Sequence, residues 1–215
     1  MAKRILHGIS DTQFIDLQQK YRSELDEFDA NSAGELKYLD LAHWTGEKLK
    51  LARALDLDRS SPLAILDLGA GAGHFARICN FFGHHVTSVD VEVQIYNDIA
   101  RLLDVSRTIM RIEPEVPLPN FDRKFDLITA VAINFNQIDW NVRYWSLEQW
   151  KFLFSDLVSR QLQFPGRIYF ELNQEYRGDQ LIYNSELLEY CERNGAAVSE
   201  RGVINWEFDK WRTLD

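Results

Sequence analysis

The sequence predicts an α/β fold, with a seven-stranded, mostly parallel, doubly wound sheet, a C-terminal antiparallel hairpin and an N-terminal helical appendage. Three observations lead to this prediction. From residue 61 onward, strand-like apolar runs alternate with segments of helical periodicity, which is typical of a parallel sheet covered by helices. One buried-strand run breaks into three glycines at alternate positions and resumes as a helix. The first 60 residues carry helical periodicity without strand signals.

The appendage, residues 1–60, is predicted to contain two helices. The apolar face of the first helix consists of residues at spacings of three and four, namely Phe14, Leu17, Tyr21, Leu25 and Phe28. The second helix is expected from about residue 34 to residue 57, after the breaker 31–34. Ser60-Ser61-Pro62 then marks a loop into the first strand.

Residues 61–215 are predicted to form the sheet domain. The expected strands are 63–68, 86–90, 107–112, 125–133, 167–172, 196–199 and 203–208. The expected helices are 73–82, 96–103, one that opens at the capping box of Ser146 and Gln149, and one around 185–193. Gly83 is expected to cap the first of these helices, and Pro165-Gly166 to end the third.

The composition indicates which classes of substrate and partner to expect for this chain. Its 215 residues, 46% apolar and 27% charged, suit one domain with an appendage. The net charge is −9 and lysine and arginine do not cluster, so a phosphate-rich polymer would be repelled. We therefore expect a small-molecule substrate and no nucleic acid. The oligomeric state is left open.

Cysteine usage and hydropathy predict a cytoplasmic protein. Cys79 and Cys191 are far apart, lack metal-like spacing and lie in apolar helical contexts, which favours buried thiols and no metal site. The N-terminus lacks the apolar core of a signal peptide, and no uncharged apolar run is long enough to span a bilayer. We expect no membrane association.

The glycine turn that follows the first strand predicts a ligand site. Gly69, Gly71 and Gly73 allow backbone amides to approach a small molecule closely. A dinucleotide fingerprint would place its third glycine at position 74, which is His74. Asp67, two places before the first glycine, would repel a diphosphate and favour a cationic ligand.

These residues resemble motif I of the class I S-adenosylmethionine-dependent methyltransferases. The family pattern, an acidic residue followed by glycines at alternate positions, is matched at Asp67, Gly69, Gly71 and Gly73. The family's second marker is an acidic residue that ends the next strand and holds the ribose hydroxyls, and Asp90 stands there. Segments 31–36 and 125–130 resemble bacterial members. The resemblance implies S-adenosylmethionine as cofactor and S-adenosylhomocysteine as product.

The resemblance also implies a set of cofactor-binding residues. They are Asp67, Gly69, Ala70, Gly71, Gly73, Phe75, Asp90, Val91, Glu113 and Asn134. Two alternatives without a ligand stay open. The glycine turn can be a plain connection from strand to helix, and Asp90 can be a turn residue. Glu113 or Glu115 would substitute for the family's adenine-facing acid, or either is a solvated loop carboxylate. Asn134 is equally a turn residue.

The candidates for proton transfer are Glu171, His43 and His74. Glu171, or Asn173 beside it, is expected beyond the end of a strand and above the ligand crevice. The two histidines are candidates because histidine titrates near neutral pH, although a packed or exposed histidine without a catalytic role is the more common case. The appendage is expected to act as a lid, and its aromatic and histidine side chains would then touch substrate. These are Tyr21, Tyr38, His43 and Trp44.

The activity implied is methyl transfer to an oxygen or nitrogen of a small polar acceptor by in-line displacement. Such transfer needs mainly the alignment of the nucleophile with the methyl group. Two rivals remain at this point: a nicotinamide-dependent oxidoreductase and a catalytically silent binding subunit.

Overall fold

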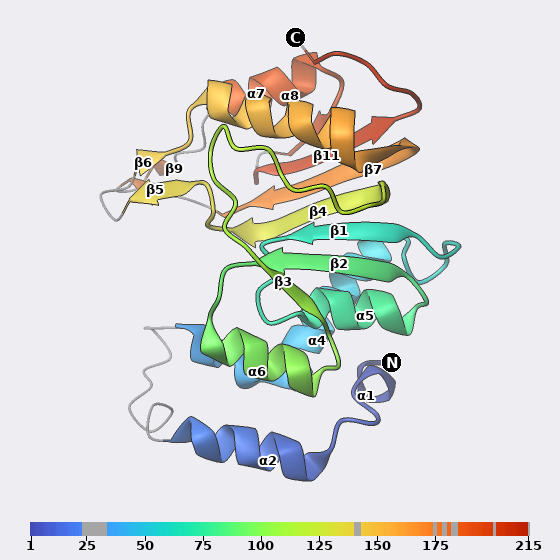
Figure 1. Cartoon of the computed structure of the whole chain (residues 1–215), viewed down its shortest axis with the longest axis vertical. Coiled ribbons are helices and arrows are strands. Elements are labelled where there is room, and N and C mark those ends of the chain that lie inside the picture. The colour runs from blue at the N-terminus through green and yellow to red at the C-terminus, as the bar shows by residue number, and fades with distance from the viewer. Residues whose placement is uncertain are drawn as a thin grey trace. The chain divides into compact units, whose positions relative to one another are not determined.

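The computed structural model describes residues 1–22, 34–139, 143–173, 176–177, 180–181, 185–199 and 201–214 (Figure 1). The chain divides into two compact units. The first unit comprises Met1–Pro62 and Ala70–Met110, and the second comprises Leu63–Gly69 and Arg111–Asp215. The chain passes from the second unit to the first inside the glycine turn, at the peptide between Gly69 and Ala70.

Seven strands form the main sheet, in the order β10-β11-β7-β4-β1-β2-β3. They are β1 Ala64–Leu68, β2 His85–Asp90, β3 Arg107–Ile109, β4 Phe125–Ile133, β7 Leu162–Leu172, β10 Ala197–Val198 and β11 Val203–Phe208. The pairs β1–β4, β4–β7 and β2–β3 are parallel, whereas β7–β11 and β10–β11 are antiparallel. The predicted fold class, a mostly parallel seven-stranded sheet with a C-terminal antiparallel hairpin, is confirmed.

The strand order reverses next to β1. Strands β2 and β3 follow β1 in one direction of the order, and β4 and β7 follow it in the other. The switch point lies between β1 and β4, and open α/β sheets bind ligands beyond the carboxyl ends of the strands at such a point. At that end of the second unit, Gly69 follows β1 and Asn134 follows β4.

Helices precede the first strand and connect several of the later strands. Those of the first unit are α1 Ala2–Ile5, α2 Asp11–Lys20, the 3₁₀ helix η1 Glu35–Leu39, α4 Leu41–Ala54, α5 His74–Phe81 and α6 Gln94–Leu102. Those of the second unit are α7 Leu147–Asp156, its π-helical continuation η2 Leu157–Gln161, and α8 Ser185–Arg193. The predicted capping box is present, because Ser146 and Gln149 bond each other's backbone at the start of α7. Gly83, with φ of +91°, follows α5 as predicted.

The appendage differs from its prediction at Asp40. The sequence predicted one helix from about residue 34 to 57, but η1 ends at Leu39 and α4 begins at Leu41. The Asp40 carboxylate accepts a hydrogen bond of 3.0 Å from the backbone N–H of His43. It thereby satisfies a donor that a continuous helix would have used internally. In the first helix the apolar face is present to Tyr21, and Leu25 and Phe28 lie outside the described residues.

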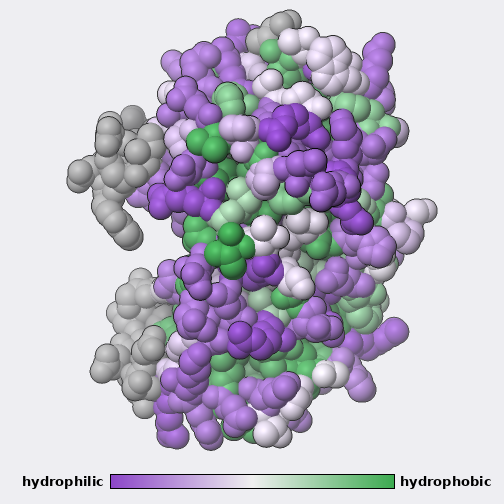
Figure 2. Space-filling view, in the orientation of Figure 1, coloured by the Kyte–Doolittle hydropathy of each residue, from purple (hydrophilic) through white to green (hydrophobic). Residues whose placement is uncertain are grey.

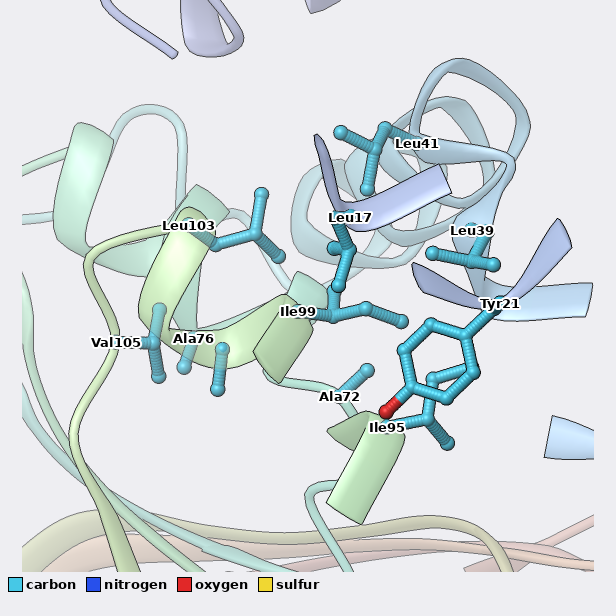
Figure 3. Packing of buried hydrophobic residues seen from close by; sticks show 11 residues of the cluster. Leu17, Tyr21, Leu39, Leu41, Ala72, Ala76, Ile95, Ile99, Leu103 and Val105 are labelled. Carbon is cyan, nitrogen blue, oxygen red and sulfur yellow. The ribbon is translucent and has the colours of Figure 1, made fainter. Parts of the chain in front are cut away.

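A hydrophobic cluster joins the appendage to the rest of the first unit (Figure 3). In it Leu17 and Tyr21 lie beside Ile95 and Ile99 of α6. The cluster also contains Leu39, Leu41, Ala72, Ala76, Ala100, Leu103 and Val105. At its edge the buried carboxylate of Asp98 accepts hydrogen bonds from Lys20 and, at 2.8 Å, from the Tyr21 hydroxyl. Residues of the appendage and of the glycine turn therefore share one core. A lid function for the appendage stays a prediction.

Strand β7 begins earlier than predicted. We expected Pro165-Gly166 to end the preceding helix, but η2 ends at Gln161 and β7 begins at Leu162. Pro165 lies inside β7, close to a register shift against β4 between Phe125 and Leu127. A proline is tolerated at such an irregularity because its missing N–H is not needed for the ladder there. A Cβ at position 166 would lie 2.2 Å from the Gln163 carbonyl oxygen, which explains the glycine.

Several short elements carry no clear sequence signal. They are α1 and two small hairpins, one of β5 Gln137–Asp139 with β6 Arg143–Tyr144 and one of β8 Tyr176–Arg177 with β9 Gln180–Leu181. Strands of two or three residues are too short to display the alternation that predicts a strand. The third strand, expected over 107–112, ends at Ile109.

The surface is largely hydrophilic on the face drawn in Figure 2, with smaller hydrophobic areas scattered over it. No helix within the described ranges is long and apolar enough to cross a membrane. The thiols of Cys79 and Cys191 are buried and not joined in a disulfide, as predicted. Burial raises the pKa of the Cys191 thiol to about 12.

Candidate functional site

All three glycines of the turn have left-handed backbone conformations. The φ angles are +73° at Gly69, +56° at Gly71 and +84° at Gly73, a region that residues with a Cβ rarely adopt. A Cβ at position 73 would lie 3.0 Å from Val105, and one at position 69 would lie 3.2 Å from Ile133. At Gly71 a Cβ would meet no atom of the described chain within 4 Å. The backbone at Gly71 therefore faces open space.

Asp90 closes this turn from the end of β2. Its Oδ2 accepts a hydrogen bond of 2.6 Å from the Gly71 N–H, and its Oδ1 accepts one of 2.7 Å from the Val91 N–H. The N–H of Ala70 donates to the Val89 carbonyl at 3.1 Å. The first unit thus brings together the two halves of the predicted adenosyl site, 19 residues apart in sequence. A carboxylate has about four lone-pair directions, so Asp90 keeps acceptor capacity for a ligand.

Asp67 lies on the other unit, inside β1. Its side chain is buried and accepts a hydrogen bond of 2.8 Å from the Thr129 hydroxyl of β4. The two residues are partners in the parallel ladder. Sequence reasoning missed Thr129, because only the strand register shows that it faces Asp67.

Two amides meet where β4 and β7 end. The Asn173 Nδ2 donates to the Ile133 carbonyl at 2.9 Å and lies 2.5 Å from the Asn134 Oδ1. Phe135 follows, with its ring 5.5 Å from that of Trp145. The polar segments predicted to follow strands 125–133 and 167–172 are therefore adjacent at Asn134 and Asn173. Glu171 of β7 is half-buried. Burial, followed by the charge of Glu171, raises the pKa of Tyr169.

His74 is buried beside the turn at the start of α5. Its Nε2 lies 3.1 Å from the Tyr38 carbonyl oxygen, so this nitrogen carries the proton. Its Nδ1 has no hydrogen-bond partner among the described residues. Burial lowers the pKa of His74 from 6.5 to about 4, against the opposing effect of the Tyr38 carbonyl. The imidazole is therefore uncharged at neutral pH and links the appendage to the turn.

The buried His74 predicts a stability loss in mild acid. Between pH 6.5 and 4 the unfolded imidazole binds more protons than the folded one, so the free energy of unfolding rises with pH through this interval. Acidification from pH 7 to 4.5 should remove about 2.5 kcal/mol. His74→Gln, which retains a donor for the Tyr38 carbonyl, should lack this component in urea titrations. His7→Gln, at an exposed histidine, is the control. An unchanged pH dependence in His74→Gln would contradict the assignment.

The remaining predicted residues differ in exposure. His43 is exposed on α4, with its ring 5.2 Å from that of Trp44. Phe75 is buried in α5, whereas Val91 and Glu113 are exposed. Catalytic roles for His43, His74 and Glu171, and the cofactor contacts of the other residues, stay predictions. No group of histidine, cysteine and acidic side chains in the described ranges could hold a metal ion.

Two tyrosines and an arginine near Asp90 were not predicted as part of the cofactor site. Tyr38 of η1 and Tyr96 of α6 have ring centres 5.4 Å apart, with the two rings edge to face. Burial, followed by the charges of Asp90 and Glu35, raises the pKa of Tyr38. The Arg107 guanidinium lies 5.6 Å from the Tyr96 ring centre. In the sequence, the closeness of Tyr96 to Asp90 was the signal that could have indicated a place for this tyrosine beside the site.

Neither a family model nor a curated protein matches this sequence. Among solved structures, DesVI of Streptomyces venezuelae matches with a TM-score of 0.55 and 12% identity, over 83% of this chain and 98% of DesVI. This likeness establishes the fold: the chain is a doubly wound α/β protein of the architecture found in DesVI.

Other similar structures include proteins described as methyltransferases. A TehB-like S-adenosylmethionine-dependent methyltransferase from Corynebacterium glutamicum has a TM-score of 0.49 and 16% identity, over 94% of this chain and all (100%) of the other. CalS10 of Micromonospora echinaspora, an amino pentose methyltransferase solved with S-adenosylmethionine bound, has a TM-score of 0.44 and 16% identity over 65% of this chain. The chain spans about half (54%) of the length of CalS10.

Proposed function

We propose that the chain is a class I S-adenosylmethionine-dependent methyltransferase that acts on an oxygen or nitrogen of a small polar acceptor. One observation carries the proposal. The glycine turn, with its left-handed backbone, is hydrogen-bonded through Gly71 to Asp90 at the end of β2. These are the two elements by which the sequence resembles this enzyme family.

The turn and Asp90 suit an adenosyl group. The space beside Gly71 is open, so a ligand can approach the backbone without meeting a side chain. The remaining lone pairs of Asp90 can accept hydrogen bonds from two ribose hydroxyls. In the sequence an acidic residue, Asp67, stands two places before Gly69, and its carboxylate suits the cationic end of S-adenosylmethionine better than a diphosphate.

The same residues argue against a dinucleotide. The dinucleotide fingerprint needs a third glycine at position 74 for close packing of helix on strand. Here that position carries the buried imidazole of His74, which is bonded to the appendage through the Tyr38 carbonyl. A diphosphate would also be repelled by a carboxylate at position 67.

The chemistry requires little from protein side chains. S-adenosylmethionine supplies an electrophilic methyl group, and the protein has to align the acceptor and exclude water. The amides of Asn134 and Asn173 can orient polar groups without adding charge. Of the three candidates for proton acceptance we favour Glu171, because the imidazole of His74 is buried away from a polar methyl acceptor and His43 lies exposed on α4. The net charge of −9 favours a small acceptor over a nucleic acid.

Thermal unfolding with added ligands tests the cofactor. At 100 times its Kd a ligand that binds the native state adds about 2.7 kcal/mol, which raises the Tm of a chain of this size by about 5–10 °C. S-adenosylmethionine and S-adenosylhomocysteine should each give this shift, and NAD should give none. A shift with NAD alone would favour the oxidoreductase. Binding of S-adenosylmethionine without methyl transfer to any of a panel of small polar alcohols and amines would favour the silent binding subunit.

A further inference from the structure

We propose that Arg107 is the positioning residue of the ribose-binding carboxylate, and that it sets the affinity for the adenosyl group by holding Asp90 and Val91 in place. This inference rests on the proposed function and assigns a role to a residue outside both sequence motifs. Arg107 contacts Asp90, Val91, Asn97 and Tyr96, all of which belong to the first unit.

The strand register brings Arg107 to Asp90. Strands β2 and β3 are parallel, and Arg107 is the partner of Ser88. Ser88 and Asp90 are two residues apart on one strand, so their side chains share a face of the sheet. The Arg107 side chain stands on that same face beside Ser88, and its length allows it to reach along β2 to the carboxylate.

The guanidinium holds three groups around the end of β2. Its Nη2 donates to the Val91 carbonyl at 2.9 Å and lies 4.0 Å from the Asp90 Oδ2. Its Nη1 donates to the Asn97 side-chain oxygen in α6. The Val91 N–H in turn donates to the Asp90 Oδ1. The arginine therefore bonds the residue that itself holds the carboxylate, and it restrains Asp90 from both sides.

The cost of burying this cation favours a functional reason for it. The Arg107 side chain is 3% exposed, and its Nε–H is buried without a partner among the described residues. Burial lowers the pKa of Arg107, and the charge of Asp90 opposes this effect. A well-packed apolar residue often serves stability as well as a buried ion pair does. We therefore assign the arginine to orientation of the carboxylate rather than to stability alone.

A purely structural role of Arg107 predicts a different pattern of binding losses. If Arg107 only anchored α6 through Asn97, its loss would weaken every adenosyl ligand alike. If it acts through Asp90, the loss should depend on the ribose hydroxyls that Asp90 binds. A ligand that lacks those hydroxyls separates the two roles.

The test measures the Kd of S-adenosylhomocysteine and of its 2′,3′-dideoxy analogue by calorimetry. In Arg107→Met the affinity for S-adenosylhomocysteine should fall about tenfold or more, as expected for loss of a coupled contact. The affinity for the dideoxy analogue should fall less than about threefold. Arg101→Met is the matched control: Arg101 is 78% exposed on α6, pairs with Asp98, and should leave both affinities unchanged.

Each outcome decides the proposal. Equal losses for the two ligands, or an unchanged affinity for S-adenosylhomocysteine, would overturn the role of Arg107 while leaving the proposed function intact. Failure of the wild-type chain to bind S-adenosylhomocysteine would overturn both. Should Arg107→Met not fold, Arg107→Lys keeps the charge but not the planar fork, and the same unequal loss is expected from it.

Discussion

Replacing Asp90 with alanine is expected to weaken S-adenosylhomocysteine binding about 1000-fold. Two hydrogen bonds from ribose hydroxyls to a carboxylate are together worth about 4 kcal/mol, because each is assisted by the charge. Asp90→Asn keeps one acceptor oxygen in nearly the same place, so its loss should be intermediate. Calorimetric titration of the three proteins with S-adenosylhomocysteine measures the series directly.

The alanine variant also changes the fold locally, and this needs a control. The Gly71 N–H and the Val91 N–H lose their common acceptor, which should lower the free energy of unfolding by about 1–3 kcal/mol. Binding is therefore measured at a temperature where circular dichroism shows the variant folded. Glu92→Ala removes an exposed carboxylate two residues away and should bind like the wild type. Unchanged affinity in Asp90→Ala would show that Asp90 does not hold the ribose.

The sequence alone predicted those parts of the fold that local signals specify. The glycine turn, the capping box at Ser146 and strand 203–208 depend on residues next to one another, so their patterns are readable without the fold. The break at Asp40 was missed because helical periodicity continues on both sides of it. In the structure, the hydrogen bond from the His43 N–H to the Asp40 side chain marks the start of the second helix.

Among the candidate site residues, those that belong to local patterns were likewise predicted, and those that depend on tertiary contacts were missed. Gly71 and Asp90 were predicted together because each ends a local pattern, and the first unit joins them by a hydrogen bond. Thr129 and Arg107 were missed because their relevance depends on strand register, which pairs them with Asp67 and Ser88. Register is set by tertiary packing rather than by neighbouring residues.

The neutral state of His74 was also beyond sequence reasoning. The residue was selected because histidine titrates near neutral pH, but burial removes it from that range. The Tyr38 carbonyl that binds it comes from the appendage, 36 residues earlier. Titration behaviour depends on burial and partners that no local pattern reveals.

Replacing Gly71 with asparagine should abolish measurable binding of S-adenosylhomocysteine while leaving the fold intact. Asparagine adopts the left-handed region more readily than other residues with a Cβ, and its Cβ would meet no described atom within 4 Å. The free energy of unfolding should therefore fall by only about 1 kcal/mol. The new side chain would, however, stand in the open space where we place the ligand, so the affinity should fall more than about 1000-fold.

Two further glycines separate the effect on binding from the effect on folding. Gly83 has φ of +91° and the same open surroundings, so Gly83→Asn carries the same backbone cost and should bind like the wild type. Gly73→Ala places a methyl group 3.0 Å from Val105 and should mainly destabilise the fold. If Gly71→Asn bound S-adenosylhomocysteine as tightly as Gly83→Asn does, no ligand would approach the turn, and the left-handed glycines would serve only the connection between β1 and α5.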